Sequence, residues 1–287
     1  MIQKRWAVWP FVLPGLLYLV FTHLAPTLYA LYLSFTSYDP AQRGGPEWLG
    51  LDNYARLLTD PQVARALLVT AQFAFEVIPL NIVFALALAL LLNAASRRLS
   101  GLRAAFFLPS VASAVVVSLI WLWLYEPTFG LLNQAFKAVG LGPMPWLSDP
   151  NWALHSLVIM RVWRGVGWNA VIYLAALQTI PEDVKEAGRV DGASDWQVFR
   201  YITWPLLTPV TIYVVVTGLI STFQTFAEPF VMTKGGPLES TTTVGVLIYR
   251  QAFEYGEMGL ASATSFLLAI VIFALALLNF LRVRRAG

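Results

Sequence analysis

The sequence contains no cysteine, only two histidines and few charged residues. Of its 287 residues, 12% are Asp, Glu, Lys or Arg, whereas 58% are hydrophobic. Without cysteine there are no disulfides or thiolate metal sites, and His23 and His155 have no acidic or histidine companion at metal-ligand spacing. Soluble domains carry about 25% charged residues. We therefore expect no bound metal, and we expect most of the apolar side chains to face lipid.

The charge balance is slightly basic, with a formal net charge of +3. In membrane proteins such an excess usually reports topology, because Lys and Arg are retained in cytoplasmic loops. We therefore expect contact with a lipid bilayer and no binding of nucleic acid.

Six segments are long and apolar enough to cross a bilayer, which takes about 20 residues of helix. The first apolar run continues to Phe35 without a small-residue cleavage site, so it predicts a spanning helix and not a signal peptide. The six predicted spans are Trp6–Phe35, Ala66–Leu92, Ala104–Leu124, Trp152–Leu177, Leu206–Met232 and Leu260–Leu281.

The distribution of basic residues predicts the orientation. One set of loops carries them densely and close to the helix ends, which is typical of the cytoplasmic side. The sequence therefore predicts an all-α, polytopic membrane protein with six transmembrane helices, both termini in the cytoplasm and a single domain over residues 1–287. This basic set comprises Lys4, Arg5, Arg97, Arg98, Arg103, Lys185, Arg189, Arg200, Arg282, Arg284 and Arg285.

A polar segment, residues 180–205, separates the fourth and fifth predicted spans. Gly192 offers a break between two short helices, and Ser194 with Gln197 fits a capping box that starts the second one. Pro205 is expected to end that helix. Such an amphipathic elbow either lies in lipid headgroups or docks a soluble partner, and composition alone favours neither.

The elbow carries a recognisable pattern. Glu186, Ala187, Gly192, Ile202 and Pro205 occupy the positions of the EAA loop of binding-protein-dependent, ATP-driven importers. The sequence departs from that pattern at Gly188, in place of the third alanine, and at Trp204, in place of leucine. Two further elements, residues 50–54 (GLDNY) and 233–237 (TKGGP), are also similar to those of such permeases. The chain resembles carbohydrate-uptake permeases of the ABC importer family, in particular the first, maltose-importer large-subunit type.

The resemblance implies a type I ABC importer permease fold in the plasma (inner) membrane of a bacterium or archaeon. It implies a heterodimer with a second permease, two ATPase subunits, an extracytoplasmic solute-binding protein and a sugar or oligosaccharide as cargo. The chain would be no enzyme, with no catalytic residues and no cofactor of its own, because ATP and Mg would bind the ATPases. The residues implied to couple to the ATPases are Glu186, Ala187, Gly188, Asp191, Gly192, Ala193 and Phe199.

The family's solute pathway is built from the fourth and fifth helices, where polar groups within a span usually face a cavity or one another. A flat indole and several amides and hydroxyls would suit a sugar. The candidates are Arg161, Arg164, Gly165, Trp168, Asn169, Thr222, Gln224, Thr225 and Glu228.

Several alternatives stay open at this point. Arg161 and Arg164 either pair with Glu228 as a structural ion pair or select an anionic cargo, such as a glycerol-phosphate diester or a uronate-containing oligosaccharide. Glu186 is either a docking residue or a solvated carboxylate, and Asn81 is assigned to helix packing. A secondary transporter is the less favoured alternative for the whole chain.

Overall fold

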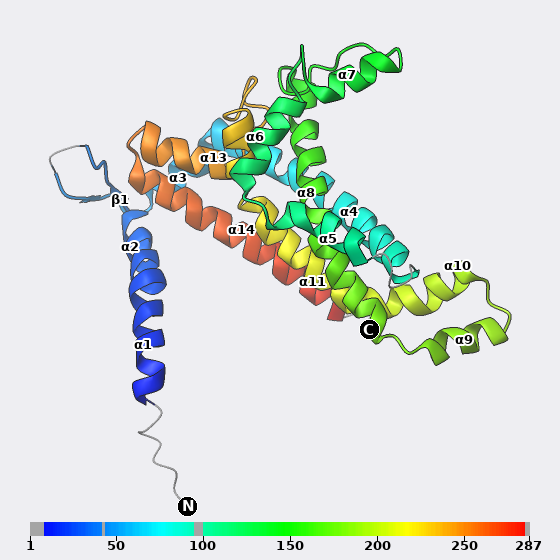
Figure 1. Ribbon diagram of the computed structural model, residues 1–287. Coiled ribbons are helices and arrows are strands. Elements are labelled where there is room, and N and C mark those ends of the chain that lie inside the picture. The colour runs from blue at the N-terminus through cyan, green and yellow to red at the C-terminus, as the bar shows by residue number, and fades with distance from the viewer. Residues whose placement is uncertain (1–8, 42–43, 95–99, 285–287) are drawn as a thin grey trace, which may run out of the picture. The chain divides into compact units, whose positions relative to one another are not determined.

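The computed structural model describes residues 9–41, 44–94 and 100–284, and these are almost entirely helical (Figure 1). The predicted cytoplasmic residues Lys4, Arg5, Arg97, Arg98 and Arg285 lie outside the described residues. The chain forms two compact units, one of residues 1–64 and 247–270 and the other of residues 65–246 and 271–287. The single domain expected from the sequence stays a prediction.

The first unit contains the N-terminal span. It runs through α1 (Trp9–Leu19), a π-helical turn η2 (Val20–Leu24) and α2 (Ala25–Leu33), and most of its side chains are exposed. Two two-residue strands, β1 (Thr36–Ser37) and β2 (Glu47–Trp48), pair antiparallel after it and are the only departure from an all-α fold in the described part of the chain. Helix α3 (Asp52–Thr59) is fastened to this strand region by Asn53, whose amide donates to the Ser34 and Thr36 carbonyls at 2.9 Å each.

The second unit contains the helices that build the site. Gly167 lets α8 approach α5 closely, because a Cβ there would overlap the Phe106 carbonyl. A buried cluster that includes Phe73, Trp121 and Leu157 packs α4, α6 and α8 together. The helices of this unit are α4 (Pro61–Ala94), α5 (Ser100–Val111), α6 (Ala114–Leu124), α7 (Leu131–Ala138), α8 (Pro150–Thr179), α9 (Glu182–Val190), α10 (Asp195–Val198), η4 (Phe199–Thr203), α11 (Trp204–Phe223) and α12 (Ala227–Met232).

The chain continues through α13 (Val244–Tyr249), η5 (Arg250–Glu254) and α14 (Met258–Arg284). Among the described residues, four helical segments are apolar and long enough to span a membrane: Pro10–Leu33, Pro61–Asn93, Asp195–Phe223 and Met258–Asn279. Helix α8 has 30 residues but is not one of these four.

The predicted span Ala104–Leu124 is not one continuous helix. The segments Arg103–Val111 and Ala114–Leu124 are bent by 105° with respect to each other. The interruption lies at Ser113, whose extended backbone (ψ 137°) starts α6 anew. Together the two segments are apolar enough to form one broken span.

The predicted span Leu206–Met232 is also interrupted, because α11 ends at Phe223 and α12 starts at Ala227. Pro229 has no N–H to donate to the carbonyl of Thr225, four residues earlier, so a continuous helix would lose this bond. The Thr243 hydroxyl donates to that carbonyl instead, at 3.0 Å. A turn between the two helices is the result, and it places Glu228 on a separate short helix.

The expectation that Pro205 ends a helix is wrong. Helical structure runs without a break from Asp195 to Phe223. A π-helical turn precedes the proline, and the Trp204 N–H donates to the carbonyl of Phe199, five residues back. This wider turn accommodates a residue that lacks an N–H and would crowd a regular α-turn.

Candidate functional site: a cavity between three helices and the elbow

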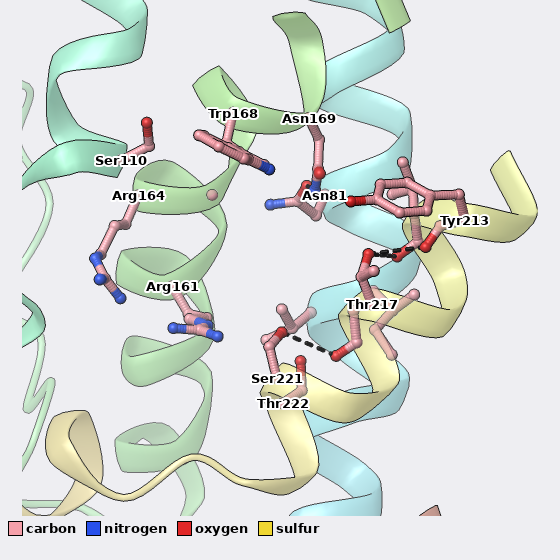
Figure 2. A pocket seen from close by; sticks show the side chains of 15 residues that line it. Asn81, Ser110, Arg161, Arg164, Trp168, Asn169, Tyr213, Thr217, Ser221 and Thr222 are labelled. Atoms are coloured by element: carbon pink, nitrogen blue, oxygen red, sulfur yellow. Dashed lines mark hydrogen bonds between the residues drawn. The ribbon is translucent and has the colours of Figure 1, made fainter. Parts of the chain in front are cut away.

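Helices α4, α8 and α11 border a cavity of about 290 Å³ in the second unit (Figure 2). Six of the nine predicted pathway residues line it, namely Arg161, Arg164, Gly165, Trp168, Asn169 and Thr222. Thr225 and Glu228 are buried beside it, and Gln224 is exposed at the end of α11 without lining it. The sequence-based candidates thus lie together, and their role in transport stays a prediction.

Two arginines of α8 share one buried carboxylate. Arg161 Nη1 lies 2.6 Å and Arg164 Nη1 3.1 Å from Glu228 Oε1, and the Thr225 hydroxyl donates to Glu228 Oε2 at 3.0 Å. The arginines are three residues apart and therefore point to the same side of α8. The Glu228 side chain is only 4% exposed, so its ionised form depends on these partners. The structural ion pair is present, and two cations with one anion leave one net positive charge here.

An amide pair forms part of the cavity wall. Asn169 Nδ2 donates to Asn81 Oδ1 at 2.6 Å, and Asn81 Nδ2 donates to the Val162 carbonyl at 3.4 Å. Gly165 makes room for this pair, because a Cβ at that position would lie 2.5 Å from Asn81 Nδ2. The packing role expected for Asn81 is confirmed, but the same residue also lines the cavity. Glycine at 165 thus has a steric explanation.

Trp168 is half exposed in the cavity wall, and its ring stacks on Phe107 with the centroids 5.9 Å apart. One face of the indole is therefore already covered by protein.

The sequence analysis missed the contribution of α11 to the cavity wall. Tyr213, Thr217 and Ser221 line it and recur every four residues, so they share one face of the helix. The four-residue spacing of these polar side chains in a mostly apolar helix was the signal that could have predicted a polar face on α11. Ser110, from α5, was also missed, and nothing in its local sequence distinguishes it.

The elbow, residues 180–205, is stabilised by hydrogen bonds between residues close in the sequence. The predicted capping box is confirmed: Ser194 N–H donates to Gln197 Oε1 at 2.7 Å, and Gln197 N–H donates to Ser194 Oγ at 3.4 Å. Helix α9 ends in a Schellman motif, with Ala193 N–H bonded to Gly188 O and Gly192 N–H to Arg189 O at 3.0 Å each. Gly192 has φ +84°, a conformation that favours glycine.

Gly188, the departure from the family pattern, lies where α9 meets the following helix. A Cβ there would be 2.8 Å from Ile202 Cδ1 and 3.6 Å from Val198 Cγ2. The missing methyl group therefore allows the two parts of the elbow to pack closely. By contrast, a Cβ at Gly192 would meet open space, so that position needs glycine for its backbone angle and not for lack of room.

The outer side of the elbow is accessible. Glu186, Ala187 and Asp191 are exposed, whereas Ala193 and Phe199 are partly buried. Within the described residues, the Glu186 carboxylate has no hydrogen-bond or ionic partner. Two apolar side chains are also strongly exposed, Val190 (86%) and Trp196 (68%).

Glu182 organises the charges of α9. Its carboxylate lies 2.8 Å from Lys185 Nζ and 3.4 Å from Arg189 Nη1, and Arg189 Nε lies 3.3 Å from Asp195. The hydrogen bond from Lys185, with the charges of Lys185 and Arg189, lowers the pKa of Glu182. The charges of Lys185 and Arg189 are thus partly neutralised by Glu182 and Asp195, whereas Glu186 takes no part in this network.

The described residues include no group of three or more His, Asp or Glu arranged to hold a metal ion.

A family model described as "Binding-protein-dependent transport system inner membrane component" matches residues 81–285. The chain belongs to this family. It is therefore a membrane-embedded permease of the ABC importer type, as the resemblance predicted, and a secondary transporter is excluded. Permeases are the transport components of such importers and not their enzymes.

Relatives of this permease support the assignment along the whole chain. It is 35% identical to the lactose transport system permease protein LacF of Rhizobium radiobacter, with 96% of this chain and 93% of LacF covered. It is 30% identical to the sn-glycerol-3-phosphate transport system permease protein UgpA of Pectobacterium atrosepticum, with 99% and 96% covered.

The fold is that of a solved importer. A chain of the bacterial alginate ABC transporter, solved in complex with an alginate pentasaccharide-bound periplasmic protein, matches this permease with a TM-score of 0.86. The two chains are 22% identical, and the match covers 99% of this chain and 96% of that one. The predicted permease fold is therefore correct, whereas six spans and cytoplasmic termini stay predictions.

Proposed function

We propose that this permease forms, with a second permease, the pathway of a binding-protein-dependent importer for a sugar or oligosaccharide. Two ATPase subunits on the cytoplasmic side would bind ATP and Mg, and an extracytoplasmic solute-binding protein would deliver the cargo. In this arrangement the chain crosses the membrane six times. Helices α5 and α6 together form one broken span, and the continuous helix α8 forms a further span. Both termini and the elbow lie on the cytoplasmic side.

The observation that carries the proposal is the surface of the elbow. The exposed apolar side chains of Val190 and Trp196 are poorly suited to water, and the exposed carboxylate of Glu186 lies on the same elbow without a partner among the described residues. They suit a groove of a soluble partner that supplies a basic group and apolar contacts. Binding of ATP would then shift the importer between inward-facing and outward-facing states, by at most the difference in ATP affinity between the two states.

The coupling role of Glu186 can be tested by removing its charge in the assembled importer. We expect Glu186→Gln to lower transport and solute-stimulated ATP hydrolysis by about tenfold, as is typical for loss of a charge-assisted contact of about 1.5 kcal/mol. Asp183→Asn is the matched control, because Asp183 is an exposed acid on the same helix that lies outside the family pattern. Equal transport by both variants and the wild type would show that Glu186 does not couple to the ATPases.

The neutral cargo is supported by the state of the charges at the cavity. Arg161 and Arg164 are both engaged by Glu228, so neither presents an unpaired cation to the solute. The amides and hydroxyls in the remaining wall match the hydroxyl groups of a sugar. Saturable ATP-dependent uptake of neutral sugars by proteoliposomes with the complete importer tests this directly.

An anionic cargo is the second candidate, and one observation favours it. The cluster keeps one net positive charge, and the Nε atom of Arg164 is buried without a hydrogen-bond partner among the described residues. A carboxylate or phosphodiester in the cavity would be attracted by this net positive charge. Competition separates the two candidates: excess glycerophosphodiester or uronate disaccharide would block uptake only if the cargo is anionic.

A further inference from the structure

The cavity has two chemically different ends. Arg161 and Arg164 lie at one end, and no other cavity-lining residue in the described part of the chain is charged. The other end is formed by Tyr213 and Thr217 of α11 together with the Asn81–Asn169 pair (Figure 2). Tyr213 precedes Ser221 by eight residues, so this row of polar groups extends about 12 Å along the helix. The cavity is long enough to offer separate surroundings to different parts of one solute.

The hydroxyl groups along this row are oriented by the helix itself. Thr217 donates to the Tyr213 carbonyl at 2.8 Å, and Ser221 donates to the Gly218 carbonyl at 3.2 Å. A hydroxyl that donates back to its own helix keeps lone pairs with which it can accept another hydrogen bond. Thr217 and Ser221 therefore present acceptors to the cavity.

Donors are available opposite these acceptors. Within the described residues, neither the Tyr213 hydroxyl nor the Trp168 indole N–H has a hydrogen-bond partner. The Tyr213 side chain is 53% exposed and reaches from α11 toward Asn81 and Asn169 (Figure 2). No aromatic partner covers its ring in the described part of the chain, whereas Trp168 has one face on Phe107. Tyr213 thus offers an aromatic surface in this cavity that is open to a ligand.

The geometry points to a second, uncharged subsite in the cavity, in which Tyr213, Thr217 and Asn169 bind a neutral pyranose unit of the cargo. Each sugar hydroxyl both donates and accepts, so it pairs with the acceptors of α11 and with the amide or phenol donors. The apolar face of the sugar ring packs on Tyr213. This inference rests on the proposed function, since it assumes a carbohydrate cargo, and it assigns to α11 the selection of a neutral unit.

The test uses the complete importer in proteoliposomes with lactose, maltose, trehalose and maltotriose as labelled probes, each at saturating solute-binding protein. We expect Tyr213→Ala to lower the uptake rate about tenfold or more, and Thr217→Val about threefold, as is typical for loss of an aromatic contact and of one hydrogen bond. Thr208→Val is the matched control. Thr208 lies on the same helix and donates to the Trp204 carbonyl at 3.4 Å, but it does not line the cavity.

The outcomes separate this inference from the proposed function. If the wild type accumulates none of the four sugars, the carbohydrate assignment fails, and the subsite with it. If the wild type accumulates one of them and the Tyr213 and Thr217 variants match Thr208→Val, only the subsite is overturned. If Tyr213→Ala prevents assembly, Tyr213→Phe and Thr217→Val replace it in the comparison with Thr208→Val, because both nearly preserve the side-chain volume.

Discussion

The elbow and the cavity are held together in opposite ways. The bonds of the elbow join residues three to seven positions apart, as in the Ser194–Gln197 capping box and the Arg189–Glu182 pair. At the cavity, two of the bonds that join different helices connect residues 64 and 88 positions apart, namely Arg164–Glu228 and Asn169–Asn81. The elbow is exposed and is defined by its own sequence, whereas the cavity exists only after α4, α8, α11 and α12 have packed. A substitution at the cavity should therefore affect the packing of several helices, whereas a substitution in the elbow should affect only nearby residues.

The largest loss of stability is expected on removal of the buried carboxylate beside the cavity. Glu228→Ala leaves Arg161 and Arg164 without their anion, and breaking a buried pair in this way typically costs about 3–5 kcal/mol. We expect a clearly lower midpoint of thermal unfolding for the detergent-solubilised importer. Glu239→Ala is the control, because its carboxylate lies 3.8 Å from Arg65 and is 40% exposed. Equal midpoints for both variants would mean that the Glu228 cluster does not stabilise the packed helices.

A smaller effect is expected from overfilling the cavity wall. Gly165→Ala places a Cβ 2.5 Å from Asn81 Nδ2, and such overpacking typically costs about 1–3 kcal/mol. Gly218→Ala is a matched change on α11, where the new Cβ would lie at an ordinary 3.5 Å from Ile78. Thermal unfolding and uptake should be impaired by the first change and nearly unaffected by the second. The opposite order would contradict the placement of the amide pair.

A change in the elbow should stay local. Ser194→Ala removes the cap of the second elbow helix, which typically costs about 1 kcal/mol. We expect faster hydrogen exchange for amides of residues 195–198 and unchanged exchange for peptides from α8 around Asn169. If exchange also rises throughout α8, the two regions are not independent, and the contrast drawn here is wrong.

The smallest expected effect is the acid sensitivity of α9. The pKa of Glu182 is lowered, so its charge stabilises the folded elbow above the ordinary carboxyl pKa, and this contribution is lost as the pH falls through the lowered value. Opening of α9, measured by hydrogen exchange corrected for the intrinsic pH dependence of the exchange rate, should therefore increase between pH 5 and pH 3, and Glu182→Gln should reduce this dependence. An identical pH profile in the variant would show that the Lys185 and Arg189 contacts contribute nothing.

The same contrast explains what the sequence could predict. The capping box and the break at Gly192 depend on neighbouring residues, and both predictions were confirmed. The end of α11 at Phe223 could not be predicted in this way, because the carbonyl of Thr225 is satisfied by Thr243, which is distant in the sequence. The continuation of the helix through Pro205 depends on a π-helical turn, which follows no simple residue pattern.

The candidate site was predicted in part for the same reason. Arg161 and Asn169 of α8 are polar residues in a segment predicted to span the membrane, where such residues are unusual, so they were found as candidates. The partners that complete the wall, such as Asn81 and Tyr213, could be assigned to it only once the packing of three helices was known.

The unbroken helix from Asp195 to Phe223 has a mechanical consequence. Its 29 residues have a contour length of about 44 Å and carry Trp196 near one end and Thr222 near the other, with a π-helical turn and Pro205 between them. No loop interrupts this segment, so the elbow and the cavity wall on α11 share one continuous helical backbone. In the proposed importer, a partner bound at Trp196 would therefore act on the same helix that carries Tyr213 and Thr217.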